Sequence, residues 1–181
     1  RCDQLEDVSA LGHVRVLDVS FCERVADVSA LSGVHTLTLW GCSGISDVSA
    51  LGSVTNLILA DNAKIRDVSS LGGLQQLHLS GLSRLKSLRG VEAVPTLTVA
   101  NCRRLPPSVA ALGKVISLRL VDWPRIDHLS SLSEVHSLSL VRCGGELDTS
   151  FLAGVAHLTV SDCPGATSPA GCGSEATEVD E

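Results

Sequence analysis

The chain has 181 residues, a formal net charge of −6 and 44% hydrophobic residues. This balance excludes a global positive field of the kind that drives non-specific nucleic-acid binding, and no apolar run reaches the roughly 20 residues that a transmembrane helix needs. Aromatic residues make up only 2% of the chain, so the core must consist of Leu, Val, Ile and Ala, which suits a regular stacked fold.

A block of about 20 residues recurs along the chain and is the strongest signal in the sequence. The run DVSAL at residues 7–11 returns at 27–31 and 47–51 and, with one change, at 67–71. Weaker copies begin near residues 87, 108, 128 and 148, with one additional residue near Pro106 and Pro107. We therefore predict a solenoid over residues 1–163, in which residues 1–6 end a preceding copy, and a flexible acidic tail over residues 164–181.

Each copy contains a short alternation of apolar and polar residues. In the second copy it reads Val34-x-x-Leu37-x-Leu39-x-x-Cys42. The Leu-x-Leu part is typical of a strand with two inward side chains. One such strand cannot bury its apolar face alone, so we expect successive strands to stack about 4.8 Å apart in a parallel sheet.

This pattern, Leu-x-x-Leu-x-Leu-x-x-Asn/Cys, resembles the leucine-rich-repeat family. The Cys-containing variant is similar to the repeats of F-box substrate receptors and to short repeats of protist leucine-rich-repeat proteins. The resemblance implies an α/β-type repeat solenoid, mostly β, wound as a right-handed horseshoe with a concave parallel sheet. Only about ten residues close each turn here, so we expect short 3₁₀ or irregular segments on the convex side.

One position of the repeat is almost always Cys or Asn, and we call this row the ladder. It comprises Cys2, Cys22, Cys42, Asn62, Cys102, Cys143 and Cys163. The family resemblance implies that Asn here binds backbone groups left open where the strand turns, and a thiol is a small substitute with a weak donor. No Cys-x-x-Cys pair or His cluster indicates zinc, and disulfides suit parallel, in-register side chains poorly.

The thiols also carry expectations about the environment. Free thiols favour an intracellular, reducing compartment. Cys172 lies outside the ladder and is expected to be the exposed, reactive thiol. Leu82 and Trp123 take the ladder position in two copies, and because Trp123 is too large for a thiol slot, we expect the loop around it to be distorted.

An Asp heads each strong copy, which raises the alternatives of a catalytic or metal site and of a structural cap. The four are Asp7, Asp27, Asp47 and Asp67. An active site needs one constellation rather than four copies, whereas a carboxylate before a tight turn can accept bonds from its exposed N–H groups. We interpret the row as structural caps.

Function is expected where the copies differ while the frame stays fixed. Trp40 stands where other copies have Ser, Ala or Val, so it should be partly exposed, and exposed Trp is enriched in binding hot spots. The alternative is that Trp40 merely packs over its neighbours. The predicted partner-binding set on the concave face is Trp40, Thr38, Asn56, Ile58, Gln76, His78 and Arg119.

A basic row is predicted along one rim, in the loops after the strands. It consists of Arg24, Lys64, Arg84, Arg104 and Arg125, with Lys86, Arg89 and Arg103 close by. Such a row could meet an acidic protein, phosphate or RNA. The alternative is a solvated rim that keeps the stack soluble and pairs with nearby Asp residues. The lack of interleaved aromatic residues argues against single-stranded nucleic acid.

No catalytic motif is visible, and the histidines are not expected to converge. His35 and His136 are predicted five rungs apart, and we expect no partner for His13, His128 or His157. The sequence therefore predicts no enzyme, cofactor, metal or small-molecule substrate, but a protein-interaction module. One alternative is a structural subunit that contacts partners through its edges and open N-terminal rung. Another is the substrate-receptor part of a ubiquitin ligase, which rests on family analogy and requires an F-box segment absent from these residues.

Overall fold

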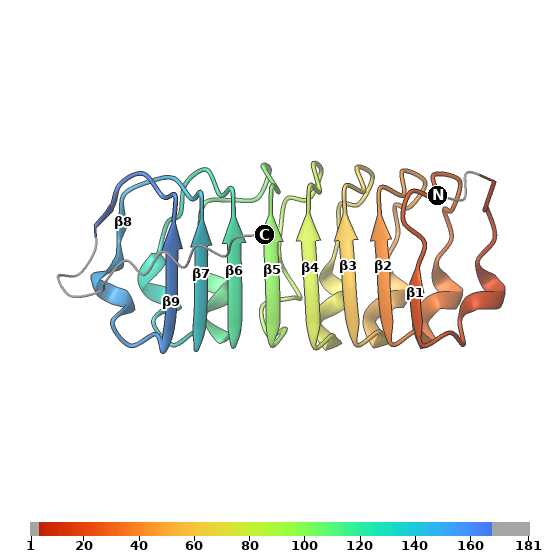
Figure 1. Ribbon diagram of the computed structural model, residues 1–181, viewed down its shortest axis with the longest axis horizontal. Coiled ribbons are helices and arrows are strands. Elements are labelled where there is room, and N and C mark those ends of the chain that lie inside the picture. The colour runs from red at the N-terminus through yellow and green to blue at the C-terminus, as the bar shows by residue number, and fades with distance from the viewer. Residues whose placement is uncertain (1–3, 168–181) are drawn as a thin grey trace, which may run out of the picture.

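The computed structural model describes residues 4–167 of the chain and forms a two-layered solenoid (Figure 1). One layer is a parallel sheet of eight strands and the other is a row of 3₁₀ helices. In spatial order the strands are β1 (Val16–Asp18), β2 (Thr36–Trp40), β3 (Asn56–Ala60), β4 (Gln76–Ser80), β5 (Thr96–Ala100), β6 (Ser117–Val121), β7 (Ser137–Val141) and β9 (His157–Ser161). The helices are η1 (Ser9–Leu11), η2 (Ser29–Gly33), η3 (Ser49–Ser53), η4 (Ser69–Gly73), η5 (Ala110–Lys114), η6 (Leu129–Leu132) and η7 (Thr149–Leu152).

The repeat period sets the register of the sheet. Leu37 lies opposite Leu57, and Leu57 lies opposite Leu77, so that equivalent residues of successive copies are neighbours. Leu97 lies opposite Leu118, one residue further along, because the loop between β5 and β6 absorbs the additional residue. The predicted mostly β solenoid, with parallel strands and short 3₁₀ turns, is confirmed.

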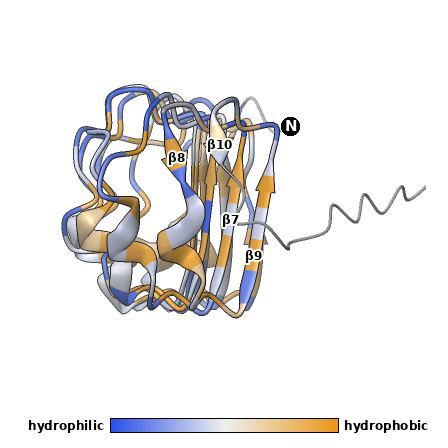
Figure 2. Cartoon of the chain, turned by 90° about the vertical axis from the view of Figure 1, so that its left-hand side faces the viewer, coloured by the Kyte–Doolittle hydropathy of each residue, from blue (hydrophilic) through white to orange (hydrophobic). Residues whose placement is uncertain are grey.

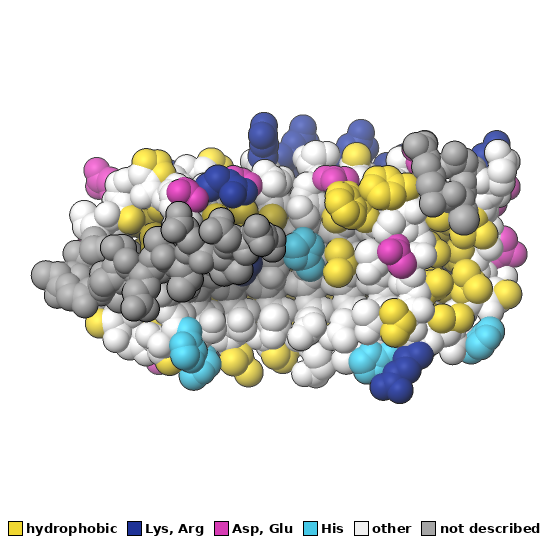
Figure 3. Space-filling view, viewed as in Figure 1, with side chains coloured by type: hydrophobic (Ala, Val, Ile, Leu, Met, Phe, Trp, Pro, Cys, Tyr) yellow, Lys and Arg dark blue, Asp and Glu magenta, His cyan; other side chains and the backbone are white. Residues whose placement is uncertain are grey.

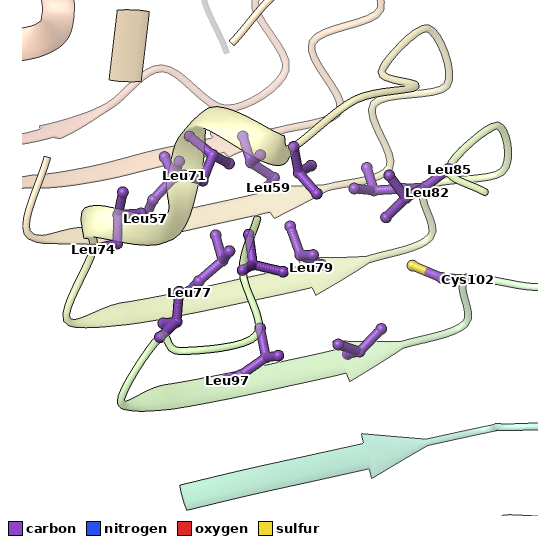
Figure 4. Close-up of a cluster of buried hydrophobic side chains, with 14 of the residues drawn as sticks. Leu57, Leu59, Leu71, Leu74, Leu77, Leu79, Leu82, Leu85, Leu97 and Cys102 are labelled. Atoms are coloured by element: carbon purple, nitrogen blue, oxygen red, sulfur yellow. The ribbon is translucent and has the colours of Figure 1, made fainter. Parts of the chain in front are cut away.

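The core lies between the two layers, and in the end view both layers carry hydrophobic residues (Figure 2). Figure 4 shows leucines from neighbouring rungs that interdigitate beneath the strands. Leu57, Leu59 and Leu79 are fully buried or nearly so. Leu17 in β1 and Leu158 in β9 occupy the same inward column but are only partly buried, because a terminal strand has a neighbour on one side only.

At the C-terminal end the described structure continues past the ladder residue Cys163. A two-residue strand, β10 (Ala166–Thr167), pairs in parallel with β8 (Leu147–Asp148) on the layer opposite the sheet. The rest of the expected tail, residues 168–181 with Cys172, lies outside the described residues, as does Cys2. Over residues 4–167 no helix is long and apolar enough to cross a membrane.

Each sheet strand is followed by one residue in the left-handed backbone conformation, with φ between 50° and 66°. These residues turn the chain out of the sheet. They are Phe21, Gly41, Asp61, Gly81, Asn101, Asp122, Arg142 and Asp162. Gly, Asn and Asp tolerate this conformation best, so Phe21 and Arg142 are the costly members of the row.

The Asp residues that head the strong copies act as caps. The carboxylates of Asp7, Asp27, Asp47 and Asp67 each accept a hydrogen bond from the backbone N–H two residues later, at 2.8 Å. The same bond to the Ser N–H holds the pKa of each carboxyl below its ordinary value. The structural interpretation of these four residues is confirmed.

The side chain at the ladder position forms hydrogen bonds with backbone groups that would otherwise be buried without partners, as Asn62 shows. Its Oδ1 accepts from the Cys42 N–H at 2.8 Å and its Nδ2 donates to the Leu39 carbonyl at 2.7 Å. Cys163 makes the same two contacts more weakly, accepting from the Cys143 N–H at 3.2 Å and donating to the Leu140 carbonyl at 3.6 Å. The exchange of Asn for Cys is therefore structural, as predicted. The described cysteines are all free thiols.

Trp123 is accommodated in the ladder at 4% exposure, but its loop changes. In two other rungs the backbone carbonyl of the ladder residue accepts a hydrogen bond from the N–H of the residue three positions later, Ile45 to Cys42 and Ile65 to Asn62. In the Trp123 rung that carbonyl instead accepts from the Gly144 N–H at 2.8 Å, in the neighbouring rung. The predicted distortion of this loop is confirmed.

Asn62→Ala should lower the free energy of unfolding by about 2–4 kcal/mol, because it leaves a buried N–H and a buried C=O without partners. Urea denaturation followed by circular dichroism measures the loss. Asn62→Cys is the matched control and should cost less, since the thiol makes both contacts elsewhere in the ladder. Equal losses in the two variants would contradict the assignment.

The buried thiols should make the fold sensitive to alkali. Burial raises the pKa of Cys102 and of Cys143 to about 11, above the ordinary value near 8.5. As the pH rises, the thiols of the unfolded chain therefore lose their protons before those of the folded chain. The contribution of the two buried thiols to the free energy of unfolding is fully present below about pH 8.5 and is lost as the pH rises towards 11. The urea midpoint should fall over this interval.

Cys102→Ala with Cys143→Ala is the comparison variant, and its midpoint should fall less steeply between about pH 8.5 and 11. Iodoacetamide labelling at the lower pH should also spare both thiols until urea is added. Identical pH profiles for the two proteins would refute this account.

Candidate interaction surfaces

The outward residues of the strands form continuous rows on the exposed face of the sheet, which we call the sheet face. Thr38 lies opposite Ile58, Ile58 opposite His78, and Asn56 opposite Gln76. Arg119 in β6 continues the first row beyond Thr98 in β5. The structure thus places every residue of the predicted partner-binding set on one face, with Arg119 two strands from His78.

Trp40 is 47% exposed at the end of β2, as expected from its small counterparts in other copies. It is also fixed in place. Its ring centroid lies 5.4 Å from that of Phe21 in a tilted arrangement, and its Nε1 donates to Asp61 Oδ2 at 2.9 Å. Trp40 therefore packs against its neighbours while about half of its surface stays exposed.

Two glycines create the space for this arrangement. A Cβ at Gly41 would lie 2.8 Å from the Phe21 ring, and a Cβ at Gly81 would lie 1.9 Å from Asp61 Oδ1. Both glycines belong to the left-handed row that follows the strands. Over its first four members the row therefore alternates a large or charged residue with Gly, which lets Phe21 and Asp61 lean over the next rung and hold Trp40 from both sides.

Other exposed apolar side chains stand at the same end of the sheet face as the tryptophan. We define the aromatic patch as Phe21, Trp40, Ile58 and Val16, which are 44%, 47%, 40% and 66% exposed. Figure 3 shows hydrophobic side chains gathered at the β1–β3 end of the sheet face. Sequence reasoning missed Phe21 and Val16. The available signal was a Phe in a row otherwise rich in Gly, Asp and Asn.

Charge on the sheet face is sparse. Asp18 in β1 is exposed, and its carboxylate accepts the Ser20 N–H at 2.8 Å. Burial lowers the pKa of the half-buried His78, and the Arg119 cation lowers it further, so His78 is neutral at pH 7. The β1–β3 end of the face therefore combines apolar surface with the carboxylates of Asp18 and Asp61.

The predicted basic rim divides into two kinds of residue. Arg24 forms an ion pair with Glu6, and Arg125 pairs with Asp127 at 2.9 Å. Arg84 and Arg104 form no ion pair with any residue in the 4–167 range. Figure 3 shows Lys and Arg side chains standing along the edge of the sheet where the strands end.

The expectation that His128 and His157 have no partner was wrong. The His157 ring packs edge-on against His136 at 5.3 Å, and His128 Nδ1 lies 3.1 Å from Ser108 Oγ. Stacking of the rungs explains both contacts. Residues at the same or an adjacent position of successive rungs become neighbours in space although they are about 20 residues apart in the sequence.

Ser108, His128 and Asp148 occupy the cap position of three successive rungs, which invites comparison with a nucleophile relay. The contacts differ from such a relay. Ser108 Oγ accepts the Ala110 N–H at 3.4 Å, Asp148 accepts the Ser150 N–H at 3.0 Å, and His128 is exposed. Ser108 and Asp148 therefore cap backbone N–H groups, whereas the His128 side chain makes no capping bond. Among the described residues no group of three or more His, Cys, Asp or Glu could hold a metal ion.

Comparison with protein-family models finds none that matches the chain, and comparison with curated proteins likewise finds no match. Solved structures do match, and those described here are internalins from Listeria monocytogenes, which are leucine-rich-repeat proteins. The internalin C2 structure has a TM-score of 0.56 at 18% sequence identity, over 85% of this chain and 84% of that one. This likeness shows the leucine-rich-repeat fold.

Two further internalins are more distant in shape. The internalin InlF has a TM-score of 0.44 at 21% identity, over 90% of this chain and 60% of that one. The functional domain of InlJ, described as including a cysteine ladder, has a TM-score of 0.46 at 17% identity, over 87% and 41%. The chain thus spans less than two thirds of the length of these two neighbours.

Asp61 should fix the orientation of Trp40. Asp61→Gly removes the acceptor while tolerating the left-handed backbone, so the tryptophan should gain mobility. Steady-state fluorescence anisotropy of Trp40 should then fall, after subtraction of the Trp123 signal measured in Trp40→Phe. Asp61→Asn keeps an acceptor and the same backbone preference and should retain the anisotropy. A fall in both variants, or in neither, would show that this hydrogen bond does not hold the ring.

Proposed function

We propose that the chain is a protein-interaction module and that its partner docks on the aromatic patch of the sheet face. The observation that carries the proposal is Trp40, exposed and yet held by Phe21 and Asp61. The fold supplies a rigid sheet on which such a side chain can be displayed without disturbing the core.

The energetic argument rests on pre-organisation. Ordering a free side chain on association costs about 0.5–1.5 kcal/mol, and Trp40 is already ordered by two contacts. Tryptophan is among the residues that dominate measured binding energies, especially where neighbouring contacts exclude water. Phe21, Val16 and Ile58 can provide that surrounding apolar surface.

The charges beside the patch indicate the partner's chemistry. Asp18 and Asp61 are exposed carboxylates at the same end of the sheet. A partner that presents an apolar side chain next to Lys or Arg would match both features, and the charges would guide its approach. Thr38, Asn56 and Gln76 would form the polar border of this interface, while Arg119 would contact only a partner that extends to β6.

A second candidate is a structural subunit that is bound through its edge. Over residues 4–167 no strand pairs with the outer side of β1, and the inward residues Leu11 and Leu17 are only partly buried. An unpaired edge of this kind is a template for another chain. Within residues 4–167 no surface feature favours the ubiquitin-ligase alternative, which stays a prediction from family resemblance.

Photo-crosslinking from the native source tests the proposal. A benzophenone amino acid at Gln76 reports on the sheet face, and one at Arg15 reports on the β1 side. A partner should be captured at Gln76, and Trp40→Ala with Thr38→Arg should abolish its capture. Phe151→Ala is the matched control, because Phe151 is 57% exposed but lies in η7 on the opposite layer.

The circular-dichroism spectrum should be the same in all variants, since none of these side chains is in the core. Unchanged capture by the Trp40 variant would refute docking on the aromatic patch. Capture only from the probe beside β1 would favour the structural-subunit function instead.

A further inference from the structure

The middle of this acidic chain is basic. Residues 68–121 contain Arg84, Lys86, Arg89, Arg103, Arg104, Lys114 and Arg119, against a single acidic residue, Glu92, whereas the whole chain has a net charge of −6. Positive charge is thus concentrated in the rungs around β4 and β5. A feature so localised needs an explanation other than general solubility.

Four cations meet at one place on the edge where the strands end. Arg66, Arg84, Lys86 and Arg104 line a surface hollow of about 380 Å³. They come from the loops after β3, β4 and β5, so they stand on three successive rungs, about 4.8 Å apart per rung. We call these four residues the basic cluster.

The basic cluster lacks neutralising partners. None of its four members forms an ion pair within residues 4–167. By contrast, Arg24 and Arg125, at positions equivalent to Arg84 in other rungs, are paired with Glu6 and Asp127. The alternative that the rim cations only form ion pairs with nearby acidic residues therefore holds for the two ends of the rim but not for its centre.

The cap row changes at the same rungs. Asp67 is followed one rung later by Ser87 and then by Ser108. Ser87 Oγ accepts the Arg89 N–H at 3.0 Å and Ser108 Oγ accepts the Ala110 N–H at 3.4 Å. The capping bond is kept while the carboxylate is lost, so two negative charges are missing beside the basic cluster.

We propose that the basic cluster binds a compact oligophosphate, meaning a small molecule with several linked or neighbouring phosphate groups. Three guanidinium groups present paired donors that match phosphate oxygens, and Lys86 adds a point charge. The hollow is lined by no aromatic side chain on which a nucleobase could stack. The site lies on a different surface from the aromatic patch, so this inference is independent of the proposed function.

Isothermal titration calorimetry of the full chain with inorganic tripolyphosphate tests the proposal. Binding is expected at about 50 mM salt and should weaken at about 200 mM, because the attraction is electrostatic. Arg84→Gln with Arg104→Gln should weaken binding roughly tenfold or more, since each removes charged hydrogen bonds. Arg24→Gln with Arg125→Gln removes the same charge from the same row and should change affinity less than about twofold, because both residues are already paired.

Three results would overturn the proposal. They are equal weakening in both double variants, no tripolyphosphate binding by the wild-type chain, and tighter binding of a single-stranded RNA oligonucleotide than of tripolyphosphate. Co-sedimentation with phosphoinositide vesicles separates the source of the phosphate groups. Vesicle binding that tripolyphosphate does not displace would also count against a free oligophosphate. Circular dichroism verifies that each variant is folded.

Discussion

The in-register stacking of each strand on the next is the constraint on which everything else in this molecule depends. A rung buries its leucines only against its neighbours, as the partly exposed ends Leu17 and Leu158 show. Stacking also converts a sequence period into rows of identical side chains. Inward rows of identical side chains do not destabilise the fold, because leucines pack against leucines. Polar and outward rows place like charges or unpaired backbone groups next to one another. In the cap row the Asp carboxylates are stabilised by accepting hydrogen bonds from backbone N–H groups. In the ladder, Asn or thiol side chains bond to backbone groups that would otherwise be unpaired.

The sequence was sufficient for whatever depends on the period alone. Register and the outward rows follow from knowing that equivalent residues become neighbours. The caps follow from a carboxylate placed before a tight turn, and the role of Asn62 is what the family resemblance implies. What could not be predicted depends on how far a side chain leans across the rung boundary. Phe21 lies against Gly41 and Trp40 because the backbone turns left-handed there. The Gly, Asp and Asn residues of this row indicate the turn, but the direction in which the Phe21 ring leans does not follow from them. By contrast, the difference between paired Arg125 and unpaired Arg84 is visible in the sequence, because Asp127 stands two residues after Arg125 whereas Lys86 stands two residues after Arg84.

The molecule carries two surfaces of different chemistry, one apolar with carboxylates and one basic. The aromatic patch with its carboxylates belongs to β1–β3 on the sheet face, and the basic cluster belongs to the loops after β3, β4 and β5. Asp18 lies four rungs from Arg104, a distance of roughly 20 Å at 4.8 Å per rung, whereas Asp61 and Arg66 belong to the same loop after β3. Because exposed charges are largely screened beyond about 8 Å in physiological salt, the far ends of the two surfaces are electrostatically independent, and only the loop after β3 brings their charges close together.

Phe21 sharpens the case that the aromatic patch is more than a packing accident. An L-residue other than Gly, Asn or Asp in the left-handed region is destabilised by roughly 1–2 kcal/mol, and Gly occupies this very position in the next rung. The turn itself therefore does not require an aromatic ring. The ring is 44% exposed, so burial offsets only part of the strain. Strained residues persist where the surroundings over-determine them, and they cluster at functional sites. What Phe21 does provide is a wall that orients Trp40, and this costly arrangement of an exposed tryptophan is the reason we propose the aromatic patch as the docking surface.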